Sequence, residues 1–140
     1  MSKTFSGLLA IAIAAVSLPV LAQDTAPARY VVAAKVFANG EVIGSPRLTV
    51  TAGQQTAIQV SGERGYALEV VVDDDGSRST TGEALRLNSR LYFRQDSDWV
   101  LVGAPQISMV EGTSARLSSS SPTVYGDGGY ALEVDVVRAD

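Results

Sequence analysis

The sequence predicts an all-β protein, an antiparallel β-sandwich, and three observations lead to this fold class. Short segments alternate apolar with polar residues, which is the period-2 pattern of a half-buried strand. Residues typical of turns, mainly Gly, Pro, Asn and Ser, separate these segments. The six-residue string Gly-Tyr-Ala-Leu-Glu-Val occurs twice without change, at 65–70 and at 129–134. An identical string in so short a chain indicates a tandem duplication.

The duplication divides the chain into segments. We expect a signal peptide at 1–22, a flexible lead-in at 23–28, a first β repeat at 29–72, a polar linker at 73–82 and a second β repeat at 83–140. Each repeat offers about four short strands, too few to bury both faces of its own sheet. We therefore expect the two repeats to stack or merge into a sandwich, with closure into a small barrel as the alternative.

The first 22 residues have the features of a bacterial Sec-type signal peptide. Lys3 supplies a positive charge, 7–18 is an almost unbroken apolar run, and the stretch ending in Ala22 suits a signal peptidase. The apolar run is shorter than the roughly 20 residues that a membrane span requires. We expect cleavage after Ala22, no membrane span after that cleavage, and a periplasmic or secreted location.

In the first repeat, four segments have clear strand character, and 41–43 is a short return strand between the first two. The four segments are 29–37, 47–50, 56–60 and 66–72. Asn39-Gly40 is the strongest hairpin signal in the chain. Pro46 opens a strand, a position that a sheet tolerates, and Gly53 is expected at positive φ in a hairpin turn.

The second repeat follows the same order of strands and turns. Pro105 and Gly112 take the places of Pro46 and Gly53 at an offset of 59 residues, whereas the two Gly-Tyr strings lie 64 residues apart. Five extra residues therefore fall within 118–128. We expect them to lengthen a loop and to leave the strands intact.

Composition excludes several kinds of chemistry. The chain has no histidine and no cysteine, so Ser-His-Asp and Cys-His catalysis are impossible and the usual zinc, copper and haem ligands are missing. Its formal net charge is −4, with the cationic residues scattered, which argues against nucleic acid as a partner. The sequence predicts a non-enzymatic protein without catalytic residues, metal site or cofactor.

The stretch 44–60, Gly-Ser-Pro-Arg-Leu-Thr-Val-Thr-Ala-Gly-Gln-Gln-Thr-Ala-Ile-Gln-Val, resembles a β-hairpin of the bacterial outer-membrane secretins. That family has a Ser-Pro-Arg-hydrophobic-Thr strand, a Gly or Asn turn before Gln, and then Ala-x-Ile-x-Val-Gly. Ser61-Gly62 stands here in place of the last glycine. The stretch is also similar to periplasmic tails of antirepressor-type metallopeptidases. The resemblance implies a β module of the cell envelope, without a secretin pore.

Three residues are candidate binding residues. Tyr125 lies among Ser and Gly in the lengthened segment, an arrangement typical of a contact loop, although it could equally cover the end of the sandwich. Asp127 lies in the same loop. For Trp99, the only tryptophan, a core or inter-repeat anchor is favoured over a ligand platform. Asp73-Asp74-Asp75-Gly76 lacks the alternate spacing of a calcium loop, so a solvated linker is favoured over a calcium site there.

Together these observations predict a protein that binds another envelope or secreted protein, chiefly through the loop at 118–128, with addition to a sheet edge as one possible mode. One alternative is a structural accessory of a secretion or pilus assembly. Another is a carboxylate-dependent hydrolase, which would need a pair of carboxylates in a roomy pocket. The oligomeric state stays open.

Overall fold

The computed structural model describes residues 27–79 and 82–139, without the side chains of 75–79. The predicted signal peptide and residues 23–26 of the lead-in lie outside the described residues. The described chain forms ten strands: β1 (Arg29–Ala38), β2 (Glu41–Gly44), β3 (Arg47–Thr51), β4 (Thr56–Val60), β5 (Tyr66–Ser79), β6 (Gly82–Gln95), β7 (Asp98–Gly103), β8 (Gln106–Val110), β9 (Ser114–Ser119) and β10 (Tyr130–Arg138). Within these residues, no helix is long and apolar enough to cross a membrane.

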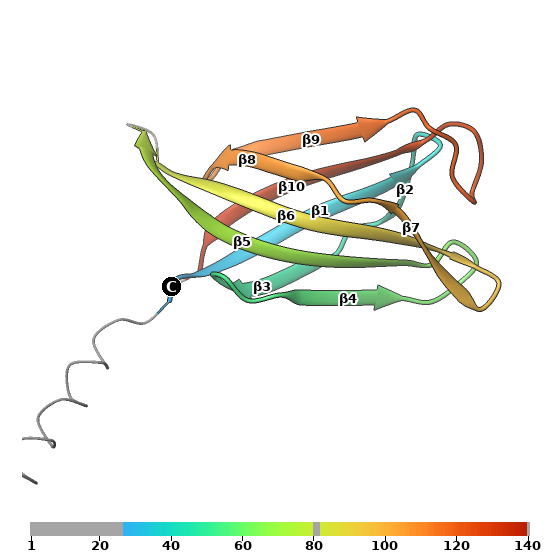
Figure 1. Cartoon of the computed structure of the whole chain (residues 1–140), viewed down its shortest axis with the longest axis horizontal. Helices are drawn as coiled ribbons and strands as arrows, with labels where there is room; N and C mark the ends of the chain where they lie inside the picture. The colour runs from blue at the N-terminus through green and yellow to red at the C-terminus, as the bar shows by residue number, and fades with distance from the viewer. Residues whose placement is uncertain (1–26, 80–81, 140) are drawn as a thin grey trace, which may run out of the picture.

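Two antiparallel sheets pack face to face (Figure 1). Sheet A has the order β2-β1-β10-β9, and β3 continues the row of β2 along β1. Sheet B has the order β4-β5-β6-β7, and β8 continues the row of β7 along β6. The sheets do not close onto one another, so the predicted antiparallel sandwich is confirmed and the barrel alternative is not observed.

The two halves of the chain interleave in these sheets. The first half, β1 to β5, places β1, β2 and β3 in sheet A but β4 and β5 in sheet B. The second half, β6 to β10, does the reverse, so β5 pairs with β6 and β10 pairs with β1. Each sheet therefore contains strands from both halves, and neither half buries its own apolar faces.

Alternation along the strands builds the core between the sheets. On β1 the side chains of Tyr30, Val32, Ala34, Val36 and Ala38 point inward and are at most 4% exposed. On β6 the inward row includes Leu85, Leu87, Leu91 and Phe93, all fully buried. Burying a Leu, Val or Phe side chain stabilises the fold by about 1.5–3 kcal/mol, so this two-layer core is the main source of stability in a chain without disulfides.

Packing explains the repeated Gly-Tyr string. A Cβ at Gly65 or Gly129 would press against a carbonyl oxygen of the preceding strand, so only glycine fits there. The rings of Tyr66 and Tyr130 lie against Gly44 and Gly103 of the opposite sheet, where a Cβ would overlap them. The Glu of each string faces a cationic residue of the neighbouring strand, in the pairs Glu69–Arg90 and Glu133–Lys35. Each string thus begins a strand of one sheet with a buried tyrosine whose ring reaches a glycine of the opposite sheet.

Two sequence predictions were wrong. Of the polar linker expected at 73–82, residues 73–79 instead continue β5 and Gly82 begins β6, and Asp73 pairs with Arg86 and Asp74 with Leu85 across the two strands. Gly53 and Gly112 do have positive φ, 79° and 86°, but they do not turn hairpins. β3 and β4 belong to different sheets, as do β8 and β9, so each glycine lies where the chain crosses between the sheets.

Candidate functional site

Four connections meet at one end of the sandwich, the right-hand end in Figure 1, and the two halves differ most there. The connections are the turns at 39–40 and 96–97 and the loops at 61–65 and 120–129. The β6–β7 hairpin is four residues longer than its β1–β2 counterpart, which follows from two equivalent bonds: Ala34 N donates to Pro46 O and Ser89 N donates to Pro105 O. With the longer β9–β10 loop, both extensions of the second half lie at this end.

Tyr125 closes this end of the sandwich. Its ring stacks on Phe93 with the centroids 4.7 Å apart. Its hydroxyl donates to Gly65 O at 2.6 Å and accepts from Arg94 N at 2.9 Å. The bond to Gly65 O reaches across to the β4–β5 loop of the first half, whereas Phe93 and Arg94 belong to β6 of the second half. Of the two roles considered for Tyr125, the structure therefore places its side chain as a cover over the core.

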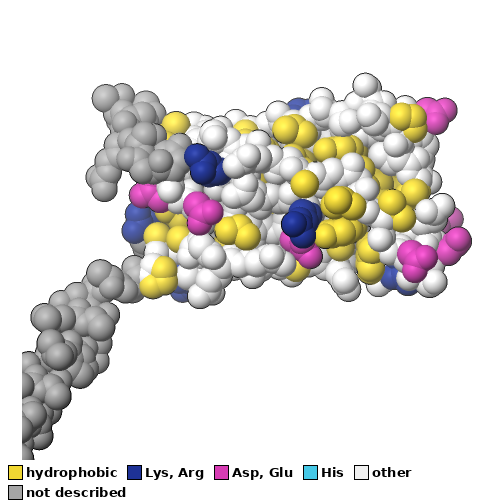
Figure 2. All heavy atoms as spheres, viewed as in Figure 1, with side chains coloured by type: hydrophobic (Ala, Val, Ile, Leu, Met, Phe, Trp, Pro, Cys, Tyr) yellow, Lys and Arg dark blue, Asp and Glu magenta, His cyan; other side chains and the backbone are white. Residues whose placement is uncertain are grey.

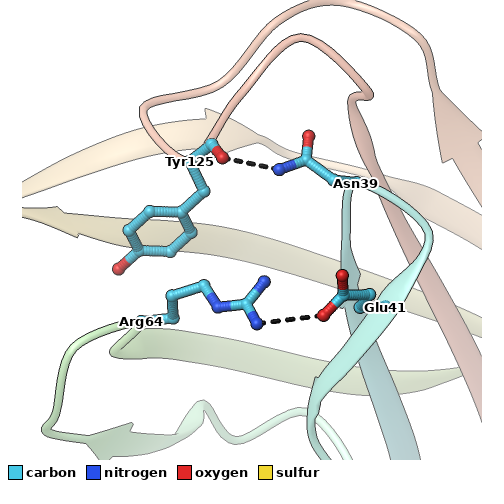
Figure 3. A network of polar contacts seen from close by, with 4 residues as sticks. All are labelled: Asn39, Glu41, Arg64 and Tyr125. Carbon is cyan, nitrogen blue, oxygen red and sulfur yellow. Dashed lines mark hydrogen bonds and ion pairs between the residues drawn. The ribbon is translucent and has the colours of Figure 1, made fainter.

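Asn39 holds the backbone of the same loop from the other side (Figure 3). Its side-chain amide donates to Tyr125 O at 2.5 Å, and its Oδ1 accepts from Gly128 N at 2.8 Å. Asn39 has a φ of 53°, a left-handed conformation that asparagine tolerates in a tight turn. The long loop is thereby fixed at both its tyrosine and its end. Asp127, between these two anchors, is exposed to solvent.

Trp99 lies on the outer face of the β6–β7 hairpin and outside the core cluster, so its favoured role as a core anchor was wrong. It pairs with Arg94 across β6 and β7, and the Arg94 guanidinium carbon lies 5.1 Å from the centre of its ring. Arg94 Nε also donates to Asp96 O at 3.1 Å, which orients the guanidinium. The structure does not bring Trp99, Tyr125 and Asp127 together around one cavity.

A groove opens beside them, between β7 and the β9–β10 loop. It has a volume of about 250 Å³ and its wall residues carry no charge. One wall is Val100, Leu101 and Val102, the other is the loop segment 121–124, and Tyr130 borders both. Leu101 is 52% exposed and Val124 38% exposed. Burial of Tyr130 raises the pKa of its phenol, so the groove holds no ionised group at neutral pH.

The first half has a corresponding place between β2 and the β4–β5 loop. Aligning the halves on their prolines and on their Gly-Tyr strings places Glu41 opposite Val100 and Arg64 opposite Gly128. Here Arg64 and Glu41 form an ion pair at 3.1 Å that spans the gap from loop to strand (Figure 3). The second half has replaced both charges by uncharged residues and has lengthened the loop.

Sequence reasoning missed the wall residues of this groove. Leu101 stands at the position of Val42, and both are about half exposed. Local sequence patterns do not show that the β9–β10 loop lies beside Leu101. The acidic run proposed and rejected as a calcium site gathers no metal-ligand cluster among the side chains that the structure describes.

No family model, curated protein or solved structure matches this chain.

Proposed function

We propose that this protein is a non-enzymatic binding module of the bacterial envelope or secreted fraction, and that it holds a protein partner in the groove between β7 and the β9–β10 loop. The observation that carries the proposal is the contrast between the two halves. The same framework position is spanned by the Glu41–Arg64 ion pair in one half and is left uncharged and open in the other. Packing of the tyrosines does not require this change, because Tyr66 and Tyr130 are both buried on their glycines, at 2% and 8% exposure.

The chemistry of β7 supports a protein partner. β7 is an edge strand, and within the described chain its only strand partner is β6. Five of its six residues are uncharged, and its exposed Leu101 adjoins Val124 and Pro122 of the loop. In Figure 2, hydrophobic side chains gather over the region that β7 crosses in Figure 1. Edge strands of isolated proteins usually carry charges or prolines that block pairing, so an apolar edge beside an apolar loop suits a partner that adds a strand or inserts an apolar side chain.

The location rests on the leader-like segment at 1–22 and on the resemblance of 44–60 to secretin sequences. Both are features of the sequence. They support a partner in the same compartment, an envelope or secreted protein, and they are independent of the groove.

Photo-crosslinking at matched positions tests the proposal. A photoreactive residue replaces Leu101 in one variant and Val42 in another, in the full chain expressed in its source organism. These positions are equivalent in the two halves and equally exposed, 52% and 51%, so Val42 is the control for random collision. We expect a discrete adduct from position 101 and a much weaker one from position 42. Equal labelling at both positions would contradict the groove as the contact site.

A structural accessory of an envelope assembly is the second candidate, and the unpaired edge of β7 is the observation that favours it. Replacing 121–124 by Gly and Ser, with Tyr125 kept in place, separates the candidates. A partner that is recognised through the loop is lost in this variant. A neighbour that joins through the backbone of β7 is retained, and a Val102→Pro variant then releases it.

A further inference from the structure

A second hollow lies on the outer face of sheet B, where its edge row is interrupted. β7 ends at Gly103 and β8 begins at Gln106, with Ala104 and Pro105 between them. Ser89 fixes this break, since both its backbone N and its Oγ donate to Pro105 O, at 3.0 and 2.9 Å. Because the row has only small side chains here, the face beside it is hollowed to about 330 Å³.

The hollow is lined in part by the apolar residues Val70, Val71 and Ala104. Besides Ser89, five polar side chains from four segments also line it. They are Gln55 of the β3–β4 turn, Glu69 of β5, Asn88 and Arg90 of β6, and Gln106 of β8. The strand register sets them in two rows, with Asn88 opposite Gln106 and Glu69 opposite Arg90. Among the described residues only Glu69 is engaged, by a long hydrogen bond of 3.4 Å from the Tyr92 hydroxyl. The three amides and the guanidinium make no side-chain hydrogen bond or ion pair within the described chain.

The first half shows which part of this arrangement the fold requires. The equivalent break at Ser45–Pro46 in sheet A leaves a hollow of about 240 Å³, bordered by Ala33, Lys35, Arg47, Glu133 and Asp135. Its shape is the same consequence of an interrupted edge row. Its side chains are not the same, because Ala33, Arg47 and Asp135 stand where sheet B has Asn88, Gln106 and Val71. The fold therefore accounts for the presence of a hollow in each sheet. It does not account for the three amide side chains that line the hollow of sheet B.

We propose that the hollow of sheet B binds a neutral saccharide unit of a glycan. Each Asn or Gln amide offers both donors and acceptors, and vicinal hydroxyl groups likewise both donate and accept. Glu69 and Arg90 extend the same set with one acceptor and one donor group, and their opposite charges leave the hollow without a net preference for an ionic ligand. The volume suits a small ligand.

Nuclear magnetic resonance tests this directly on the protein expressed from its complete sequence. Chitotetraose, cellotetraose and maltotetraose are titrated separately, and the side-chain amide signals of Gln55, Asn88 and Gln106 are followed. We expect at least one tetrasaccharide to shift these three signals together and saturably. If none of the three sugars shifts them, or if the shifts map to another face, the proposal is overturned.

The two halves supply a matched variant. Asn88→Ala with Gln106→Arg places on sheet B the residues that sheet A already carries at the equivalent positions, so folding is expected to be kept. We expect this variant to weaken saccharide binding at least about tenfold, while an Ala33→Asn, Arg47→Gln variant of sheet A keeps the original affinity or improves it. Unchanged affinity in the first variant overturns the proposal. Crosslinking from Leu101 is expected to be unaffected, so failure here is distinct from failure of the proposed protein-binding groove.

Discussion

The two places where a loop meets an edge strand, β2 with the β4–β5 loop and β7 with the β9–β10 loop, share one framework and differ in their surface. In both, a buried tyrosine lies on a glycine of the opposite sheet. In the first, Arg64 and Glu41 join loop to strand; in the second, Val100 and Gly128 stand at those positions and a groove is open. The difference teaches that the core geometry of this sandwich tolerates surface change at its end without loss of packing. Four predictions test how far this comparison holds.

The largest effect is expected in the core, where the halves are alike. Leu68 and Leu132 are equivalent residues of the Gly-Tyr strings and both are fully buried. Leu68→Ala and Leu132→Ala are each expected to lower the free energy of unfolding by about 3 kcal/mol, through lost burial and the cavity left behind. Urea denaturation measures both values. A difference of more than about 1.5 kcal/mol between the two losses would show that the two halves do not contribute equally to the stability of the core.

A comparable effect is expected at alkaline pH, where Tyr30 of the first half makes the largest contribution. Burial and the hydrogen bond of 2.6 Å to Glu83 raise the pKa of Tyr30 from 10.0 to about 12. The unfolded chain therefore loses this proton first, so the stability contribution is complete below pH 10 and disappears as the pH rises to about 12. Two pKa units correspond to roughly 3 kcal/mol.

Tyr30→Phe is the variant that isolates this contribution, since it keeps the ring and removes the titrating group. We expect the fall in unfolding free energy between pH 10 and 12 to be shallower in the variant than in the natural chain. The buried Tyr66 and Tyr130, whose pKa values are also raised by burial, leave part of the slope in place. An identical slope in the variant and the natural chain would mean that ionisation of Tyr30 does not contribute to the loss of stability at alkaline pH. The equivalent residue of the second half is Leu85, which has no proton to lose.

A smaller effect is expected at the cover of the loop end. Tyr125→Phe keeps the stacking on Phe93 and removes the hydrogen bonds to Gly65 O and from Arg94 N. We expect a loss of about 1 kcal/mol, together with faster amide hydrogen exchange at Arg94. Unchanged exchange at Arg94 would indicate that its direct bond to Gly65 O, at 3.2 Å, suffices.

The smallest effect is expected at the ion pair. The double variant Glu41→Val, Arg64→Gly gives the first half the residues of the second. The pair is solvent-exposed, so its removal is expected to cost less than about 1 kcal/mol. Thermal unfolding measures this, with Arg116→Ala, which breaks the partly exposed pair with Glu133 at 3.4 Å, as a reference. A much larger loss would mean that the ion pair holds the loop and that the two ends are not interchangeable.

Much of the fold could be predicted from the sequence because its determinants are local. The alternating strands, the Asn39-Gly40 turn and the positive φ of Gly53 all follow from neighbouring residues. Sheet membership does not, since the same Gly turn can close a hairpin or carry the chain to the opposite sheet. The acidic run from Asp73 was wrongly predicted as a linker for a similar reason. Its local composition is typical of a solvated segment, but Asp73 and Asp74 pair with Arg86 and Leu85 of β6, which are distant in the sequence.

The candidate site was predictable only in outline. The lengthened segment at 118–128 does form most of the β9–β10 loop that carries Tyr125, while the binding role expected of Tyr125 stays a prediction. Which side of the loop turns inward depends on Phe93 and Asn39, residues far away in the chain. The groove and the hollow of sheet B both arise from the meeting of distant edges, and only the comparison of the two halves reveals their special composition.

The order of strands also has a consequence for how the protein folds. Sheet B is assembled from neighbours, β4 to β8 in succession, so its contacts close short loops. Sheet A instead joins the beginning of the chain to its end, since β1 pairs with β10 over nine residue pairs. Closing so long a loop is slow and entropically costly. Sheet B is therefore expected to act as the folding template, and sheet A can be completed only after the last strand has been synthesised.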